Sequence, residues 1–118
     1  MKEKFLHNKT NEQFDLYKTT LFDPNSENWD NLKDQIIKLE EDVFKNKGYN
    51  EQRLRELFEE EKNIVLLLNN EENIFGYLTA VPMDEETVFI TSVAIKTEFQ
   101  GKGLVKKIMT ALKDEAIN

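Results

Sequence analysis

The sequence contains no cysteine, and it has one histidine, two prolines and four glycines among 118 residues. Without cysteine the chain has no disulfide, no thiolate nucleophile and no cysteine-ligated metal, and the composition suits a reducing compartment. His7 lies in a polar stretch and has no second histidine with which to share a metal ion. We therefore expect a cytoplasmic protein that binds no metal and carries out no redox chemistry.

Long hydrophobic runs are also missing. The longest apolar run spans Ile64 to Leu68, whereas crossing a bilayer takes about 20 residues. The first 13 residues contain no apolar segment of signal-peptide length. We expect no membrane partner.

Basic residues are few relative to acidic ones, 16 against 23, and the net charge is −7. This charge argues against nucleic acid, because affinity for phosphate backbones comes mainly from clustered Lys and Arg. Residues 96–107 are the exception: their four lysines and one glutamate give +3, leaving −10 on the rest. One short segment is therefore electropositive, and the acidic remainder would attract a cationic partner, such as a polyamine, an aminoglycoside or a lysine side chain, over long range.

Nothing divides the chain into domains. It has no internal repeat, no linker rich in Pro or Gly and no low-complexity tract, and hydrophobic residues make up 39% of it. Residues 1–12 are polar and aperiodic. We predict one domain over residues 1–118, with a flexible tail over residues 1–12.

The first half of the chain predicts one strand and two helices. Aromatic and β-branched residues indicate a strand over 14–22. A helix follows, capped by Ser26 or Asp30 and ending near Lys47, and Asn50 caps a second one. Acidic residues 59–61 fit a solvated helix end better than a site. The apolar positions with helical spacing are Trp29, Leu32, Ile36, Leu39 and Val43, then Leu54, Leu57 and Phe58.

The second half predicts three strands and a helix. The runs 63–68, 74–81 and 87–95 are rich in β-formers, and the short loops between them permit only antiparallel hairpins. A closing amphipathic helix is marked by Leu104, Val105, Ile108, Met109 and Leu112. The predicted order is β-α-α-β-β-β-α, an α+β or α/β fold.

The segment Gln100-Gly101-Lys102-Gly103 joins the last strand to this helix. Glycines before a helix allow an anion to reach the unpaired amides of its first turn, although such a segment is also common as a tight turn. A Walker loop does not fit, and Lys106 stands where a dinucleotide fingerprint needs its third glycine. A phosphate-binding loop of another kind and a plain tight turn both remain open at this point.

Residues 91–104, TSVAIKTEFQGKGL, resemble the acetyl-CoA motif of the GNAT superfamily of N-acetyltransferases. The family pattern [RQ]-x-x-G-x-[GA] is met by Gln100 and Gly103 after the strand Val93-Ala94-Ile95, and it departs at Val105. A backbone amide at Val105 can still donate, while its branched side chain hinders close approach. The element order is similar to that family too.

The resemblance implies acetyl transfer from acetyl-CoA directly to a primary amine. It implies cofactor contacts from the main chain of two strand residues and from the loop amides: Val93, Ile95, Gln100, Gly101, Lys102, Gly103, Leu104 and Val105. Some relatives place a carboxylate base in the strand before the loop, where this chain has Phe89 and Thr91. Glu85 and Glu86 fit a solvated turn better than a catalytic role, so no catalytic residue is assigned.

The resemblance also implies a mostly antiparallel mixed sheet flanked by helices. The family continues with further strands beyond the closing helix, so the chain is expected to be C-terminally truncated relative to it. The open edge of the strand 87–95 then predicts a homodimer through that strand. The alternatives are a non-catalytic fragment or interaction module that binds CoA or a protein partner at that edge, and a domain that binds another anion.

Overall fold

The computed structural model describes residues 18–25, 28–70 and 73–117, with side chains to residue 115. Four strands form one sheet in the order β1-β2-β3-β4, and each neighbouring pair is antiparallel. The strands are β1 (Lys18–Leu21), β2 (Ile64–Asn69), β3 (Ile74–Pro82) and β4 (Val88–Ile95). The predicted hairpins are confirmed, and β4 lies at one edge of the sheet.

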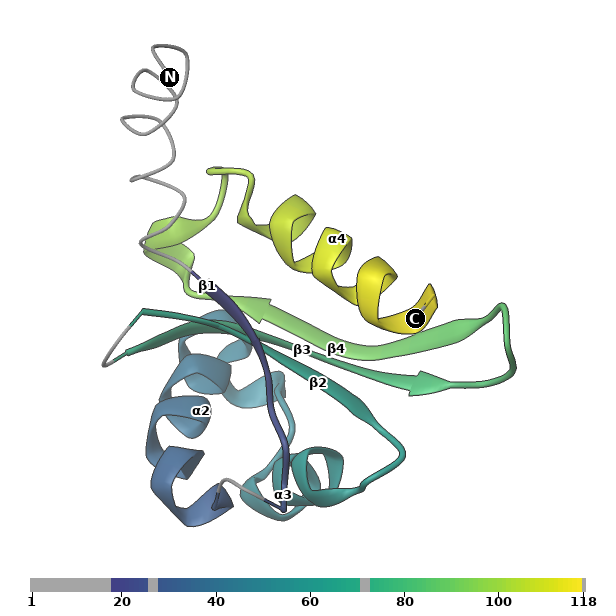
Figure 1. The fold of residues 1–118 in the computed structure, drawn as a ribbon. Helices are drawn as coiled ribbons and strands as arrows, with labels where there is room; N and C mark the ends of the chain where they lie inside the picture. The colour runs from purple at the N-terminus through teal and green to yellow at the C-terminus, as the bar shows by residue number, and fades with distance from the viewer. Residues whose placement is uncertain (1–17, 26–27, 71–72, 118) are drawn as a thin grey trace, which may run out of the picture.

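Helices cover both faces of this sheet (Figure 1). One face carries α2 (Trp29–Phe44) and α3 (Glu51–Glu59), and the other carries α4 (Leu104–Ile117). The predicted β-α-α-β-β-β-α order is confirmed, with short 3-10 turns added at Lys45–Lys47 and Thr97–Phe99. Among the helices in the described ranges, none has both the length and the apolar character needed to cross a bilayer.

The start of α2 corrects the predicted cap. Asn28, rather than Ser26 or Asp30, precedes the helix in an extended conformation, and its side-chain oxygen accepts the Asp30 N–H at 3.0 Å. Asn caps as well as Ser or Asp do, and Asp30 lies in the first turn, where its charge complements the helix dipole. Ser26 lies outside the described residues.

The other N-terminal predictions hold where they can be checked. Asn50 caps α3 by accepting the Arg53 N–H at 2.8 Å, and residues 59–61 are exposed. The predicted strand over 14–22 is present at Lys18–Leu21 and ends one residue earlier than predicted. Residues 1–17, including the predicted tail, lie outside the described residues.

The two faces of the sheet pack against cores of different composition. The α2 and α3 face is aromatic: Trp29, Phe22 and Tyr77 surround Phe58, with ring centroids 5.1, 5.5 and 5.6 Å from it. The α4 face is aliphatic, built from Leu and Ile of β2, β3, β4 and α4. Val105 and Met109 of α4, predicted as part of the buried stripe, are 46% and 37% exposed. They lie one residue past Leu104 and Ile108, on the flank of the buried face.

Candidate functional site

The connection from β4 to α4 contains two glycines in a backbone conformation that other residues rarely adopt. Gly101 and Gly103 have φ of 81° and 79°, in the left-handed region where a side chain is disfavoured. A Cβ atom added at either position would meet no atom within 4 Å. The glycines therefore serve the backbone conformation, and the space beside them is open to a ligand.

The helix that follows presents unpaired amides to this space. The Lys107 N–H donates to the Gly103 carbonyl at 3.2 Å as the first hydrogen bond of the helix. The N–H groups of residues 104–106 precede that bond and have no acceptor within the helix. Donors of this kind, together with the helix dipole, are the groups that bind phosphate at helix N-termini. The chemistry of this donor set fits a pyrophosphate.

The polar side chains in and before the loop each make a different contact. The Gln100 amide donates to the Ile95 carbonyl at 2.9 Å, so it closes the loop. The Lys102 ammonium lies 5.5 Å from the centre of the Phe99 ring. Lys96 is paired with Glu98 at 3.0 Å. The charge on Lys102 is therefore held at the loop, while that of Lys96 is partly neutralised.

Asp42 ties the end of α2 to the start of this loop. Its carboxylate accepts the Thr97 N–H at 2.8 Å and the Thr97 hydroxyl at 3.1 Å. The backbone hydrogen bond from Thr97 is the main reason why the pKa of Asp42 is lowered. The loop is thus positioned by a residue 55 places earlier in the chain.

The main chain of β4 faces outward at alternate residues. The Lys96 N–H donates inward, to the Phe75 carbonyl, at 2.8 Å. Because backbone groups alternate in direction along a strand, those of Val93 and Ile95 point to the open edge. The Ile95 carbonyl meets Gln100 there. The sequence-predicted strand and loop residues therefore lie along one continuous edge.

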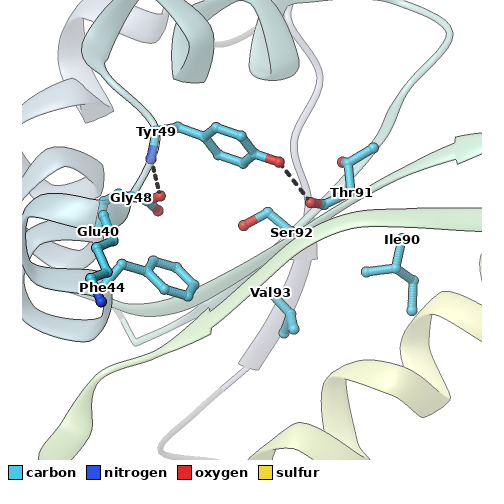
Figure 2. A pocket seen from close by; sticks show the side chains of 9 residues that line it. Glu40, Phe44, Gly48, Tyr49, Ile90, Thr91, Ser92 and Val93 are labelled. Atoms are coloured by element: carbon cyan, nitrogen blue, oxygen red, sulfur yellow. Dashed lines mark hydrogen bonds between the residues drawn. The ribbon is translucent and has the colours of Figure 1, made fainter.

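A pocket of about 480 Å³ lies beside the middle of β4. Its walls are Glu40 and Phe44 of α2, the connection at Gly48 and Tyr49, and residues 90–93 of β4. Figure 2 shows Ser92 on the side of β4 that faces α2, with Ile90 and Val93 directed toward α4. The Tyr49 hydroxyl donates to the Thr91 carbonyl at 3.0 Å across the pocket. Val93 thus belongs both to this pocket and to the predicted cofactor edge.

Glu40 is the charged residue at the back of the pocket, and it is 4% exposed. One carboxylate oxygen accepts the Tyr49 N–H at 2.7 Å, and the other accepts the Tyr77 hydroxyl. A Cβ atom at Gly48 would lie 2.6 Å from the carboxylate, so glycine is required for this approach. A buried charge is stable only when it is hydrogen-bonded in this way.

Tyr77 extends the network to β4. Its hydroxyl lies 2.9 Å from the Ser92 hydroxyl oxygen. Burial, and next the hydrogen bond to Glu40, raise the pKa of Tyr77 far above its ordinary value. The phenol therefore keeps its proton throughout the range in which proteins are folded.

Sequence reasoning did not find this network. Glu40 lies four residues after Ile36 and three before Val43, so helical spacing places it on the buried stripe. A carboxylate on an apolar stripe was the available signal, but its partners Tyr77 and Ser92 lie 37 and 52 residues further along the chain.

The other positions considered for a base do not belong to the Glu40–Tyr77–Ser92 network, although Thr91 lines the same pocket. Phe89 is 60% exposed, and the Thr91 hydroxyl lies 2.6 Å from that of Thr79 and donates to the Thr79 carbonyl. Glu85 and Glu86 are exposed in the β3–β4 turn, outside the pocket lining. Within the described ranges, no group of three or more His, Asp or Glu residues could hold a metal ion.

The structure thus combines an antiparallel sheet between helices with a helix N-terminus that follows two positive-φ glycines at the end of the edge strand. The chain matches the model of the acetyltransferase (GNAT) family over residues 12–118. It belongs to the GNAT family. No match was found among curated protein sequences.

Solved structures agree with this assignment. A GNAT family acetyltransferase from Staphylococcus aureus is 25% identical, with a TM-score of 0.64 over 85% of this chain and 77% of that one. The aminoglycoside acetyltransferase meta-AAC0020, from an uncultured soil metagenomic sample and in complex with sisomicin, is 24% identical, with a TM-score of 0.66 over 86% and 70%. The second likeness concerns the fold alone.

Proposed function

We propose that this protein is an N-acetyltransferase that moves an acetyl group from acetyl-CoA directly to a primary amine. The observation that carries the proposal is the pair of left-handed glycines, Gly101 and Gly103, which open the first-turn amides of α4 to a ligand. Of the predicted amides of Gln100 to Val105, those of Gly101 to Val105 would hold the pyrophosphate, because the Gln100 N–H is donated to the Thr97 carbonyl at 3.2 Å. Main-chain groups of Val93 and Ile95 would hold the pantetheine. Acetyl-CoA would supply the activated acyl group.

The acceptor is proposed to be cationic, because the net charge of −7 attracts amines over long range. Sisomicin, the ligand of one structural neighbour, belongs in a test panel with spermidine and a lysine peptide. A cytoplasmic location forms part of the proposal, supported by the lack of cysteine.

Isothermal titration of acetyl-CoA into the purified protein tests the cofactor site. We expect saturable binding that Gly103→Glu weakens by at least about 100-fold, or about 2.8 kcal/mol. The new carboxylate would occupy the position of the phosphate and repel its negative charge. Thr110→Glu adds the same charge at an exposed position of α4 and should bind like the wild type. Gly103→Ala strains the backbone without blocking the site, so it measures how much of the loss comes from strain alone.

The outcomes separate the candidate functions. Equal binding by the wild type and Gly103→Glu, or no binding by either, would overturn the proposed cofactor site. Binding without acetylation of any amine in the panel would favour the non-catalytic module. Stronger binding of a nucleotide or phosphosugar than of acetyl-CoA would favour another anion.

A homodimer through β4 also forms part of the proposal. It is supported by the edge position of β4 and by the 60% exposure of Phe89 on that strand. Light scattering at high protein concentration tests it. A single species of monomer mass would contradict it, whereas a dimer that Phe89→Ser dissociates would support it.

A further inference from the structure

Three polar side chains from three different elements form a chain beside the pocket. Ser92 of β4 touches Tyr77 of β3, and Tyr77 touches Glu40 of α2. Tyr77 is fully buried and Glu40 is 4% exposed, while Ser92 is half-buried and lines the pocket. The three side chains therefore link the half-buried Ser92, through a fully buried phenol, to a carboxylate that is almost wholly buried at the back of the same pocket.

The direction of its hydrogen bonds follows from donor counting. A carboxylate can only accept, so the single Tyr77 proton is given to Glu40. The Tyr77 oxygen must then accept at its contact with Ser92, so the Ser92 hydroxyl is the donor there. The lone pairs of the Ser92 oxygen remain able to accept a hydrogen bond from a group in the pocket.

The pocket suits a small amine. Its volume of about 480 Å³ falls within the range of small-molecule sites. It is lined on one side by the Ser92 hydroxyl and on the other by the apolar ring of Phe44. Val93 connects it to the edge where the acyl donor is proposed to lie.

We propose that this pocket receives the primary ammonium group of the acceptor, and that Ser92, Tyr77 and Glu40 relay a proton from it to the buried carboxylate. The inference rests on the proposed acetyl transfer and assigns its acceptor site and proton path. Ser92 touches the substrate, whereas Tyr77 and Glu40 act through it. The raised pKa of Tyr77 fits a group that passes a proton on without releasing it.

The step balances as follows. The ammonium gives one proton to the Ser92 oxygen, Ser92 gives its own to Tyr77, and Tyr77 gives its own to Glu40. The freed nitrogen lone pair attacks the thioester carbonyl carbon, so that a C–N bond forms and the C–S bond breaks. The second proton lost by nitrogen neutralises the leaving thiolate. Glu40 returns its proton to solvent through the same groups after the product leaves.

Other charged groups surround this carboxylate. Lys47 and Tyr49, from the same connection, also line the pocket. Glu41, Lys45 and Glu51 line an adjoining depression that shares Glu40 as one wall. From β3 the facing group is Tyr77, and from β4 it is Ser92. Because all these groups persist in a Tyr77→Phe variant, that variant isolates the relay.

Acetylation of ethylamine, a small probe that is almost entirely protonated at pH 7, measures the relay. We expect Glu40→Gln and Tyr77→Phe to lower kcat/KM at pH 7 by about 100-fold, the usual range for loss of a general base, with the acetyl-CoA Kd unchanged. The deficit should shrink as pH rises toward 10, since free amine no longer needs the relay. Ser92→Ala should show the same trend and Ser92→Thr should restore activity, while Thr110→Ala serves as a matched hydroxyl deletion.

Proton NMR without acetyl-CoA gives a second readout. The Tyr77 hydroxyl proton, buried and hydrogen-bonded to Glu40, should exchange slowly enough to be observed. Ethylamine at neutral pH should shift this resonance in the wild type and leave it unshifted in Ser92→Ala. This measurement tests the pocket and the relay even if one of the core variants fails to fold.

The results distinguish this inference from the proposed function. A wild type that binds no acetyl-CoA overturns the proposed function. Deficits that stay constant with pH, or a Tyr77 resonance that ethylamine does not shift, overturn the relay while acetyl-CoA binding stands. A wild type that binds acetyl-CoA and does not acetylate ethylamine at any pH also overturns the relay.

Discussion

The β4–α4 loop and the pocket beside β4 share one strand, yet they are built in opposite ways. The loop offers backbone groups, and its conformation depends on Gly101 and Gly103, both within four residues of the helix start. The pocket offers side chains, and Glu40, Tyr77 and Ser92 come from three elements. A site made of backbone groups can be specified by a short sequence motif, whereas a site made of side chains depends on how distant segments pack.

The two regions should therefore respond differently to mutation. Substitutions in the loop meet open space and should change ligand binding more than stability. Substitutions in the pocket network meet buried partners and should change stability as well as function.

The largest expected effect on stability is that of Glu40→Ala. It leaves the buried Tyr77 hydroxyl and the Tyr49 N–H without their acceptor, at a cost of about 3 kcal/mol in the free energy of unfolding. Urea denaturation measures this cost. Glu41→Ala, on the exposed next position of the same helix, should change stability by less than about 0.5 kcal/mol. Equal effects of the two variants would contradict the stabilising role assigned to the buried pocket network.

A smaller effect is expected from Gly48→Ala. The added Cβ atom would lie 2.6 Å from the Glu40 carboxylate, and such overpacking costs about 1 to 2 kcal/mol. In a Glu40→Ala background the clash is gone, so the cost should nearly vanish in a double-mutant cycle. An additive cycle would show that Gly48 is needed for a reason other than the carboxylate.

The smallest effect concerns the link between the two regions through Asp42. Its pKa is lowered in the folded protein, mainly by the Thr97 N–H, so the unfolded state binds the proton more readily. The ionised side chain stabilises the fold fully above the ordinary pKa of about 3.8, and this contribution is lost as pH falls through the lowered value.

Asp42→Asn should therefore be less stable than the wild type at pH 6, and the difference should shrink below pH 4. Urea denaturation between pH 6 and pH 2.5 measures it, with Asp34→Asn on the exposed side of α2 as the control for one lost acidic charge. A difference that does not change with pH would show that the Thr97 contact does not depend on ionisation.

The sequence predicted most of the fold because most of its signals are local. The hairpins among β2, β3 and β4 follow from short loops between β-rich runs, and Asn50 capped α3 as expected. The cap of α2 was assigned wrongly because three residues of similar capping ability, Ser26, Asn28 and Asp30, stand close together. Propensity alone cannot choose among them.

The sequence by itself determined the β-α-α-β-β-β-α order, the glycine loop and its likeness to GNAT enzymes, since each depends on neighbouring residues. Only the tertiary structure brought Glu40 to Tyr77 and Ser92, across separations of 37 and 52 residues. The physical reason is the buried carboxylate: it needs hydrogen-bond donors wherever the packing places them, and packing between a helix and a sheet is not encoded at any one position in the chain.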